Sequence, residues 1–556
     1  MRKIIICFFL FISFAGICQS TVKSKVQSSS LPFRPNILWL VTEDLSPVIP
    51  PFGDSTIVTP VLSRLAKEGV RYTHVFSPSG VCAPSRAAIA LGMYPSRVGA
   101  MHMRNGFWAA GRPSASVAEA QRKSFPPDIP YYEAVPPPDA RMHSEYLRMQ
   151  GYYCSNRFKQ DYQFVAPVTA WDDCSPTAHW HGRQAGQPFF SIFNFEVTHE
   201  SQIWGKAKDS MWVAADAVVK VPPYLPSTPV ALNDIRRMYS NVKEMDYQIG
   251  KMIDQLEKEG LLDSTIIFWY ADHGGPLPRQ KRLCYDSGLR APLIIRYPNK
   301  WRAGQIDSQL ISFVDFLPTL MSMSNTKPTE LTDGRSFAGA YESKTKRKYI
   351  HGGGDRFDEQ YDMIRAVRDQ RYKYLRNFEP TKGYYLPVAY REQMPIMQEL
   401  LRLHKSHQLN EYQEQWFRSS KPKEELFDTY TDPYELHNIA DDVKYNSKLI
   451  ELRNECDRWM NEIDDKGKMK EIDYLHSIWH GDNKPVTADP VILRHSNSIN
   501  MSSATPGASI GYKITHNNSE QSVWSIYQKP VPLLPGDKLK VIAHRIGYEP
   551  SRILEF

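Results

Sequence analysis

Beyond its N-terminal segment, the sequence has no apolar run long enough to cross a bilayer, no low-complexity tract and no block of lysine and arginine that suggests nucleic-acid binding. These absences exclude a membrane-spanning body and a disordered or fibrous chain. The 68 basic and 61 acidic side chains are spread along 556 residues, so the net charge of +7 gives only a mild attraction for anions. A composition of 42% hydrophobic and 23% charged residues is typical of a folded protein, and the length predicts more than one domain.

Cysteine is also scarce, and two of the seven cysteines lie in the first eighteen residues. The stretch MRKIIICFFLFISFAGICQS has a short basic start, an apolar run and small residues near its end, which predicts a signal peptide over residues 1–18 and export to the periplasm or the medium. A lipid anchor is less favoured, because Ile17 rather than a small residue precedes Cys18. The remaining cysteines are Cys82, Cys154, Cys174, Cys284 and Cys456. Because five is odd, at least one thiol is expected to be unpaired or modified.

Short apolar runs alternate with helical patterns along the first half of the chain. The runs are NILWLVT (36–42), FFSIFNFEV (189–197), TIIFWYA (265–271) and PLIIRYP (292–298). Nearly continuous runs of this length are typical of central strands in a parallel sheet that is covered on both faces. Thr59 and Pro60 mark the start of one helix, and a longer helical stripe from residue 235 is expected to stop at Gly260. The alternation predicts an α/β fold with a mostly parallel sheet.

Polar and charged side chains directly follow three of these strands. They are Glu43 and Asp44, His199 and Glu200, and Asp272 and His273. In open α/β sheets, ligands gather outside the carboxyl ends of the strands. One acidic pair before a turn is more often a cap or a solvated loop, but acidic residues at two equivalent strand ends favour a site for a hard divalent cation.

Four ordered segments resemble the type I, formylglycine-dependent sulfatases of the alkaline phosphatase superfamily, over most of residues 33–470. RPNILWLVTEDLSP is similar to the family's first strand and metal-binding acidic pair, and CAPSR (82–86) with GMYPSR behind it is similar to the C-x-P-S-R signature. YADHGGPLPRQKRLCYDSGLRAPLII resembles the second half of the metal site, and EELFDTYTDPYELHNIA (424–440) resembles a stretch near the end of the C-terminal subdomain. TEDLSP, KQDYQF and YDSG look closer to the N-sulfoglucosamine sulfohydrolase-like and bacterial polysaccharide sulfatase branch than to arylsulfatases.

The resemblance implies that Cys82 is the precursor of a formylglycine. A separate maturation enzyme, formylglycine-generating or radical, would read Pro84 and Arg86 and oxidise the thiol to an aldehyde. One hydroxyl of the hydrated aldehyde would attack the sulfur of a sulfate ester, and the second would let the covalent sulfate leave. Taken alone, a lone cysteine is often a buried core thiol, which is the alternative for Cys82.

The resemblance further implies one divalent cation, and calcium is favoured over magnesium because oxygen-rich cages in exported proteins suit it. The implied ligands are Glu43, Asp44, Cys82 as formylglycine, Asp272 and His273. Arg86 would steady the formylglycine oxygens, Lys159 and Lys281 would hold sulfate oxygens, and His199 would protonate the leaving sugar oxygen near neutral pH. As isolated residues, the lysines could equally be solvated and the histidine structural.

Three positions depart from the family pattern. Glu43 stands where many relatives have Asp, His273 where many have Asn, and Asp161 where many carry a histidine two residues after the lysine. The cation and the base that deprotonates the formylglycine hydrate are therefore open, with Asp161 and His102 as candidates for the base.

The C-terminal part of the chain is expected to form two smaller units. HGGGDRFDEQYDMIRAVRDQRYKYLRNF (351–378) resembles the entry to the antiparallel subdomain that closes one side of sulfatase pockets, and short strands broken by Pro and Gly after about residue 482 predict a small β-sandwich. The expected organisation is a signal peptide (1–18), a catalytic domain (33–345), a C-terminal subdomain (346–475) and a β-rich accessory domain (482–556). Candidate substrate contacts, for which a solvated loop is the alternative, are His102, Asp161, His351, Arg356, Glu359 and Asp362.

The sequence therefore favours a sulfatase acting on a sulfated carbohydrate, either an algal polysaccharide such as ulvan or a glycosaminoglycan. A phosphatase or phosphodiesterase on the same fold would need Thr or Ser as nucleophile and usually a second metal site, and neither is evident around residue 82. An inactive glycan-binding homologue is disfavoured by the intact Cys82, Pro84 and Arg86.

Overall fold

The computed structural model describes residues 34–106, 125–479 and 483–556. The expected signal peptide lies outside the described residues, as does the expected start of the catalytic domain at residue 33. Among the described helices, none combines the length and the apolar character that a bilayer span requires. The five cysteines at positions 82, 154, 174, 284 and 456 are all free thiols, and four of them are buried.

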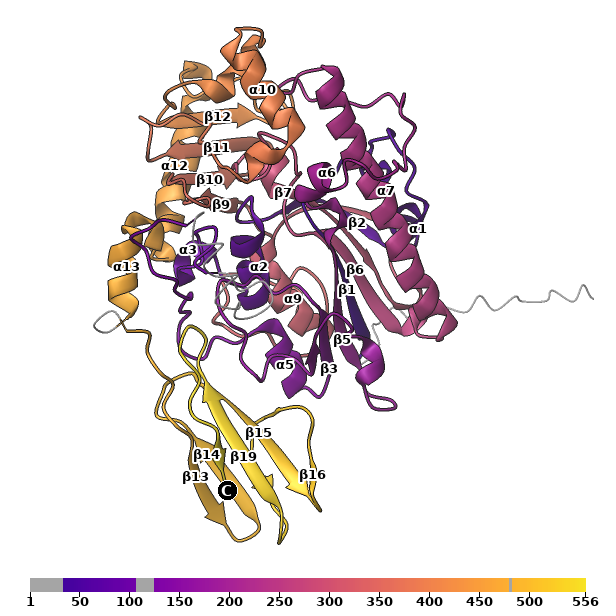
Figure 1. Ribbon diagram of the computed structural model, residues 1–556, viewed down its shortest axis with the longest axis vertical. Helices are drawn as coiled ribbons and strands as arrows, with labels where there is room; N and C mark the ends of the chain where they lie inside the picture. Colours follow the sequence, from indigo (N-terminus) through magenta and orange to yellow (C-terminus); the bar gives the residue numbers. More distant parts are fainter. Residues whose placement is uncertain (1–33, 107–124, 480–482) are drawn as a thin grey trace, which may run out of the picture. The chain divides into compact units, whose positions relative to one another are not determined.

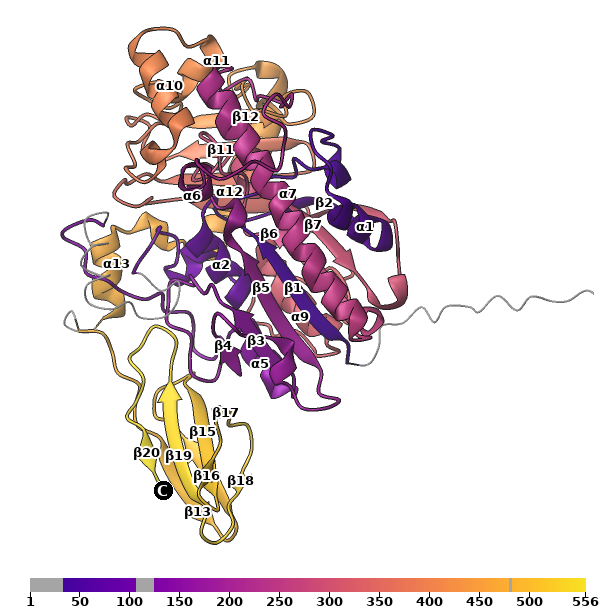
Figure 2. The same ribbon diagram turned by 45° about the vertical axis from the view of Figure 1, so that its right-hand side comes forward.

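The centre of the fold is an eight-stranded sheet with helices on both faces (Figures 1 and 2). Its strands, in spatial order, are β4 (Asp173–Cys174), β3 (Tyr153–Arg157), β5 (Phe189–Phe195), β1 (Asn36–Thr42), β6 (Thr265–Ala271), β7 (Arg290–Arg296), β2 (Val70–Phe76) and β8 (Ile306–Ser312). Every side chain of β6 is buried, as are six of the seven in β1. The sheet is mostly parallel, which confirms the α/β prediction.

Strand β7 departs from that prediction. It pairs antiparallel with both of its neighbours, β6 and β2, whereas residues 292–298 were expected to form a parallel strand. The loop between β6 and β7 (272–289) contains only the four-residue helix α8 (Asp286–Leu289) and remains at the carboxyl end of β6. A parallel return would have to cross to the opposite end of the sheet. Instead, the amides of Gly274 and Gly275 donate to the carbonyls of Gly288 and Ser287, which pairs the two ends of the loop, so β7 starts where β6 finishes and runs back.

Helices α1 (Pro60–Glu68) and α7 (Pro229–Lys258) pack against each other on one side of the sheet. Thr59 precedes α1 as predicted, but its hydroxyl makes no hydrogen bond. Asp246 of α7 instead accepts hydrogen bonds from the amides of Val61 and Leu62, so the first turn of α1 is capped from a neighbouring helix. Helix α7 ends at Lys258, two residues before the predicted Gly260.

The other helical layer contains α2 (Cys82–Leu91), α5 (His143–Met149) and α9 (Phe316–Met323). Shorter helices are α3 (Pro95–Val98), α6 (Ser201–Gly205) and α11 (Glu411–Glu414). All ten residues of α2 are buried, since it contacts α3, α5 and α9. The first residue of this buried helix is the cysteine of the signature motif.

The C-terminal subdomain is built on a four-stranded antiparallel sheet, which confirms its predicted character. The strands are β12 (Glu424–Asp428), β11 (Tyr372–Asn377), β10 (Ile364–Arg368) and β9 (Ile350–Gly354), and the helices are α10 (Pro395–Lys405), α12 (Asn446–Glu462) and α13 (Glu471–Ile478). Helix α12 packs on β10 and β11. The predicted domain boundaries themselves remain a prediction.

The tail forms two small antiparallel sheets. One contains β13 (Val491–His495), β14 (Ser498–Ser502) and β18 (Val531–Pro532), and the other contains β15 (Ser509–His516), β16 (Ser519–Glu520), β17 (Ser525–Ile526), β19 (Lys538–His544) and β20 (Leu554–Glu555). Apolar residues of both sheets, such as Ile499 and Val541, belong to one buried cluster, as expected for a β-sandwich. Ser509 donates a 2.6 Å hydrogen bond to Glu145 of α5, which ties the tail to the catalytic part.

Candidate active site

The register of the central sheet brings three strand ends to one level. Thr42, the last residue of β1, lies beside Phe195 of β5 and Ala271 of β6. The segments that follow are therefore neighbours: the amide of Asp44 donates to Asp272 (3.1 Å), and the amide of Glu200 donates to Asp44 (2.7 Å). The predicted meeting of polar residues at the carboxyl ends of the strands is confirmed.

Cys82 begins helix α2 beside this cluster. Its side chain is fully buried, with Sγ 3.5 Å from His273 Nε2 and 3.9 Å from Asp44 Oδ1. Arg86, one helical turn later, lies on the same face of α2 and donates to Asp272 (3.1 Å) and Glu43 (3.3 Å). The spacing of the signature motif thus presents the thiol and the guanidinium together to the strand ends.

The five predicted metal ligands and His199 form two overlapping groups that could hold a metal ion. Glu43, Asp44, Cys82 and His199 form one group, and Asp44, Cys82, Asp272 and His273 form the other, each with ligand atoms within 4.8 Å of one another. Nδ1 of His273 lies 3.1 Å from the Gly274 carbonyl, which leaves Nε2 facing Asp44 at 3.0 Å. Burial would lower the pKa of His273, but Asp272 and Asp44 raise it to about 10, so this position strongly favours positive charge. The donor set fits a divalent cation.

Lys281 is buried and Lys159 is half-buried beside the acidic pair, so the alternative of solvated lysines is wrong. Lys159 Nζ lies 2.7 Å from Glu43 Oε2, and Lys281 Nζ lies 2.7 Å from Asp44 Oδ2. Burial would lower the pKa of each lysine, but the adjacent carboxylates raise it, so both ammonium groups stay charged. They are placed to bind an anionic group above the acidic pair.

His199 also lies in the cluster, but its ionisation differs from the expectation. Nε2 is 3.1 Å from Lys281 Nζ, and Nδ1 is 2.8 Å from the Ser201 hydroxyl. Burial and the charge of Lys281 lower the pKa of His199 to about 3, so it does not titrate near neutrality in this environment. An anion placed against Nε2 would raise that pKa again, because it favours the imidazolium.

Glu200 and Arg282 also belong to the site, although no role was predicted for either of them. Arg282 donates two 2.9 Å hydrogen bonds to the Glu200 carboxylate, and the same carboxylate lies 3.1 Å from Lys281 Nζ. The sequence carried a weak signal, since Glu200 follows His199 and Arg282 follows Lys281 directly. Arg282 has a φ of 76°, a backbone conformation that non-glycine residues adopt at a cost and that is common at functional sites.

The surroundings of Asp161 and His102 disfavour the role of base, which stays a prediction for both. Arg104 donates to both carboxylate oxygens of Asp161, at 3.1 and 3.3 Å. Although burial would raise it, Arg104 and Lys159 lower the pKa of Asp161 to about 2, so its carboxylate is a weak proton acceptor. Nδ1 of His102 accepts the backbone amide of Arg356, and His102 is in neither metal-ligand group. Asp161 instead positions Arg104, a further cation that the sequence analysis missed.

Three of the four expected sugar contacts in the C-terminal subdomain are occupied internally. His351 is buried, with Nε2 2.8 Å from Glu455 and Nδ1 3.2 Å from the Tyr94 hydroxyl, so neither nitrogen is available to a sugar. The alternative of a solvated loop does not hold for His351 either, because residues 350–354 form strand β9. The other two expectations follow the same pattern.

Arg356 is fully buried and forms a two-bond ion pair with Glu471 (2.7 and 2.8 Å). Asp362 is buried and accepts a 2.5 Å hydrogen bond from Lys421. Both charges are compensated inside the protein, so these residues hold the fold rather than face a substrate. Glu359 is half-buried and accepts the amide of Ala389, and its sugar contact stays a prediction.

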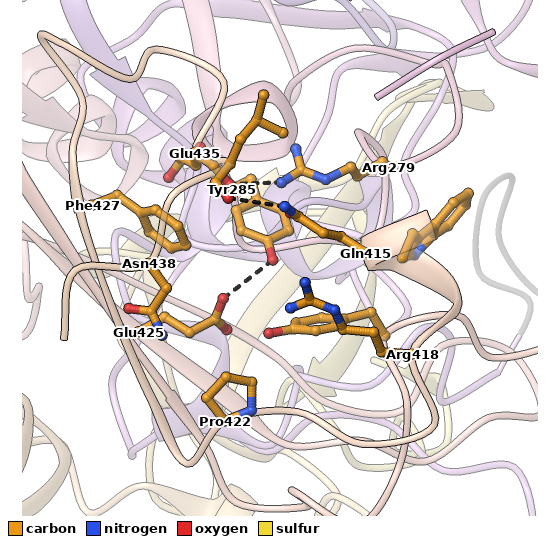
Figure 3. Close-up of a pocket in the computed structure, with 12 residues that line it drawn as sticks. Arg279, Tyr285, Gln415, Arg418, Pro422, Glu425, Phe427, Glu435 and Asn438 are labelled. Carbon is orange, nitrogen blue, oxygen red and sulfur yellow. Dashed lines mark hydrogen bonds between the residues drawn. The ribbon is translucent and has the colours of Figure 1, made fainter. Parts of the chain in front are cut away.

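A polar cavity of about 250 Å³ adjoins the loop that carries Lys281 and Arg282 (Figure 3). Arg279 and Tyr285 of this loop line it, and their polar groups are engaged: Arg279 donates to the Glu435 carbonyl (2.8 Å), and Tyr285 donates to Glu425 (3.4 Å). Gln415 likewise donates to the Leu436 carbonyl. The bonds of Arg279 and Tyr285 anchor loop 272–289 to the C-terminal subdomain and so restrain the segment that carries Lys281.

We expect Glu200→Gln to reduce sulfate-ester turnover about 10- to 100-fold, because the variant keeps the side-chain shape but removes the counter-charge that orients Lys281 and Arg282. Steady-state kinetics and bound-metal analysis would test this, with metal content expected to be unchanged. Glu196→Gln, an exposed carboxylate on the same loop, is the matched control. Wild-type turnover by the Glu200 variant would exclude a positioning role.

Comparisons with known proteins agree with this geometry. The Sulfatase family model matches residues 35–124 and 146–326, and the model of the N-sulphoglucosamine sulphohydrolase C-terminal region matches residues 279–389. The chain is 50% identical to a protein named ulvan-active sulfatase from Formosa agariphila, covering 96% of this chain and 92% of the relative. It is 23% identical to human N-sulphoglucosamine sulphohydrolase, over 77% of this chain and 90% of that protein. In fold it is similar to a putative sulfatase from Bacteroides thetaiotaomicron (TM-score 0.57, 17% identity, 79% of this chain and 94% of that chain). The chain belongs to the sulfatase family and is a sulfuric ester hydrolase.

Proposed function

We propose that the protein removes sulfate from an algal sulfated polysaccharide of the ulvan type, using Cys82 in its formylglycine form and one divalent cation. The observation that carries the proposal is the position of Cys82, whose Sγ is buried within both metal-ligand groups. The substrate class is supported by the relative named ulvan-active sulfatase, at 50% identity. A glycosaminoglycan substrate has weaker support, since human N-sulphoglucosamine sulphohydrolase is only 23% identical to this chain.

The charges of the site support a bound cation. Four buried carboxylates face four cationic side chains: Glu43, Asp44, Glu200 and Asp272, and Arg86, Lys159, Lys281 and Arg282. The formal charges of these eight side chains cancel. His273 adds a positive charge only while it is protonated and would be neutral as a metal ligand, so with a ligating His273 the side chains provide no surplus for an anionic sulfate ester. A divalent cation, which we propose to be calcium, would supply that surplus and polarise the reacting oxygens. Glu43, Asp44, Asp272, His273 and the converted Cys82 would hold it.

The protein's own side chains then divide the remaining tasks. Lys159 and Lys281 would bind sulfate oxygens, because each ammonium already points into the cluster beside a carboxylate. Arg86 would fix the converted Cys82 through its position one turn along α2. His199, hydrogen-bonded to Lys281, would hold the proton for the leaving sugar oxygen once the anionic ester raises its pKa.

Burial of Cys82 constrains when it can be modified. The residue is fully buried, so a maturation enzyme could reach the CAPSR segment only before the chain folds. The hydrated aldehyde would supply the attacking hydroxyl group. This order fits the export expected from residues 1–18, since an exported chain is unfolded during passage through a translocation pore, and export itself stays a prediction.

We expect natively matured, active protein to carry an aldehyde at position 82, and peptide mass spectrometry would detect it. Cys82→Ser should abolish turnover of a sulfated substrate, whereas Cys174→Ser, at a half-buried thiol outside both metal-ligand groups, should keep it. Production with and without a maturation enzyme should change aldehyde content and activity in proportion. Full activity in protein that has only a thiol at residue 82 would refute the assignment.

We expect Asp272→Asn to lose both bound metal and turnover while keeping most of the stability. Asparagine preserves the size of the side chain and an acceptor for the Asp44 amide, but it removes a charge that balances a cation. Elemental analysis of purified protein would measure the metal, and chelation followed by calcium or magnesium addition would identify it. Asp254→Asn, an exposed carboxylate on α7, is the control. Retention of metal and activity by the Asp272 variant would overturn the site.

We expect His199→Ala to lower turnover of a sulfated sugar by about 10² to 10⁴, and turnover of an aryl sulfate far less. A sugar alkoxide is a poor leaving group that needs a proton in the transition state, whereas a nitrophenolate leaves without one. Parallel kinetics on the two substrates, with metal content measured, would test this. Equal losses on both would assign His199 to sulfate binding, and loss of metal would make it a ligand.

A further inference from the structure

A second groove lies at the end of helix α2 that is remote from Cys82. It has a volume of about 560 Å³ and is lined by the turn and helix after α2, by residues 332–351 and by the C-terminal half of α12; we call it the α3–α12 groove. Both helices lie on the side of the molecule away from α7 in Figure 1. Because the ten residues of α2 rise about 15 Å, the groove is separate from the catalytic cluster, and no proposed catalytic residue or metal ligand lines it.

Basic side chains dominate the lining of this groove. Its cations are Arg97, Arg335, Lys346, Arg347, Lys348 and Arg458, and its acids are Asp333, Glu455 and Glu462. The acids are already engaged, since Arg97 pairs with Asp333 and Arg458 pairs with both glutamates. The lining therefore has an excess of positive charge that its own carboxylates do not neutralise.

Arg335 and Lys346 are the cations that carry this excess. Within the described parts of the chain, neither forms an ion pair, whereas Arg347 pairs with Asp315 and Lys348 pairs with Glu451. Arg335 donates long hydrogen bonds to the carbonyls of Thr345 and Lys346, at 3.3 and 3.4 Å, and Lys346 is exposed. Two cations without carboxylate partners, side by side in a groove, are suited to bind an anion.

The sequence carries a signal for this groove, which corrects the expectation that lysine and arginine form no block. Residues 344–348 read KTKRK, four basic residues in five, although the rest of the basic side chains are dispersed. The three lysines of this run are exposed. Short basic runs of this kind form patches that bind polyanions such as sulfated polysaccharides or nucleic acids.

We propose that the α3–α12 groove is an accessory binding site for the sulfated polysaccharide chain, distinct from the site that removes sulfate. The inference rests on the proposed function, because it takes its occupant from the substrate class. A polymeric substrate presents many sulfate groups, so one stretch of chain can occupy the groove while another reaches Cys82 or a second molecule. The site would hold the enzyme on its polymer and raise the local substrate concentration.

The test compares binding and turnover on long and short substrates. Lys346→Glu and Arg335→Glu should each weaken binding to ulvan about 2- to 5-fold, the range of single exposed charge contacts, in affinity electrophoresis at low salt. Added salt should narrow the difference from wild type. Turnover of a sulfated tetrasaccharide should be unchanged, since neither residue touches the catalytic cluster. Lys346→Gln, which removes the charge at an exposed position without reversing it, should show a smaller loss with no risk to folding.

Lys405→Glu is the matched control, because Lys405 is exposed, has no ion pair among the described residues and gives the same change in net charge. The proposal would be overturned if the Lys346 and Lys405 variants bound ulvan equally well. It would also be overturned if the wild-type protein bound chemically desulfated ulvan as tightly as native ulvan. Tighter binding of a DNA oligomer than of ulvan would assign the groove to nucleic acid instead. If ulvan binds through Lys346 but no sulfate is released by matured enzyme, the proposed function fails while the groove stands.

Discussion

The site depends on compensation among buried charges at the carboxyl end of strand β1. Glu43 and Asp44 are both fully buried, and an isolated buried carboxylate is costly to ionise. Each is stabilised by a lysine at 2.7 Å, and those lysines come from distant segments, the loop after β3 and the loop after β6. The same contacts therefore fix the acidic pair, the sulfate-binding cations and the conformation of two loops, so a change to one member alters the position of the others.

The antiparallel direction of β7 suits this charge compensation, because it keeps the loop before β7 beside the acidic pair. Loop 272–289 supplies Asp272 and His273 at its start and Lys281 and Arg282 in its middle, and all four must remain at one edge of the sheet. Its far side is held to the C-terminal subdomain by Arg279 and Tyr285. A crossover to the opposite edge would remove the two cations from the cluster. The antiparallel return thus keeps both halves of the loop at the active site while the subdomain anchors it from outside.

The sequence was sufficient for features that follow from local pattern. The expected strands at 36–42 and 265–271 have the same bounds as β1 and β6, and the strand-end rule placed Glu43, Asp44, Asp272 and His273 together. It was insufficient where a partner lies far along the chain. Glu200 and Arg282 are 82 residues apart, and His351 is buried by α12, a hundred residues later. Single-sequence patterns do not show which polar residue a distant element will cover.

The two regions of positive charge differ in the degree of compensation, and this difference determines what each can do. At the catalytic cluster every lysine and arginine has a buried carboxylate within about 3.3 Å. A sulfate group therefore binds there only if a metal ion adds positive charge or if one of these ion pairs opens. That requirement favours selectivity and fixed geometry over affinity. In the α3–α12 groove the surplus is permanent, on the exposed Lys346 and the half-buried Arg335. Such cations can bind an anion without requiring one fixed geometry. A chain carrying many sulfate groups can use both properties at once, because tolerant binding at one site increases the frequency with which a correctly oriented ester reaches the other.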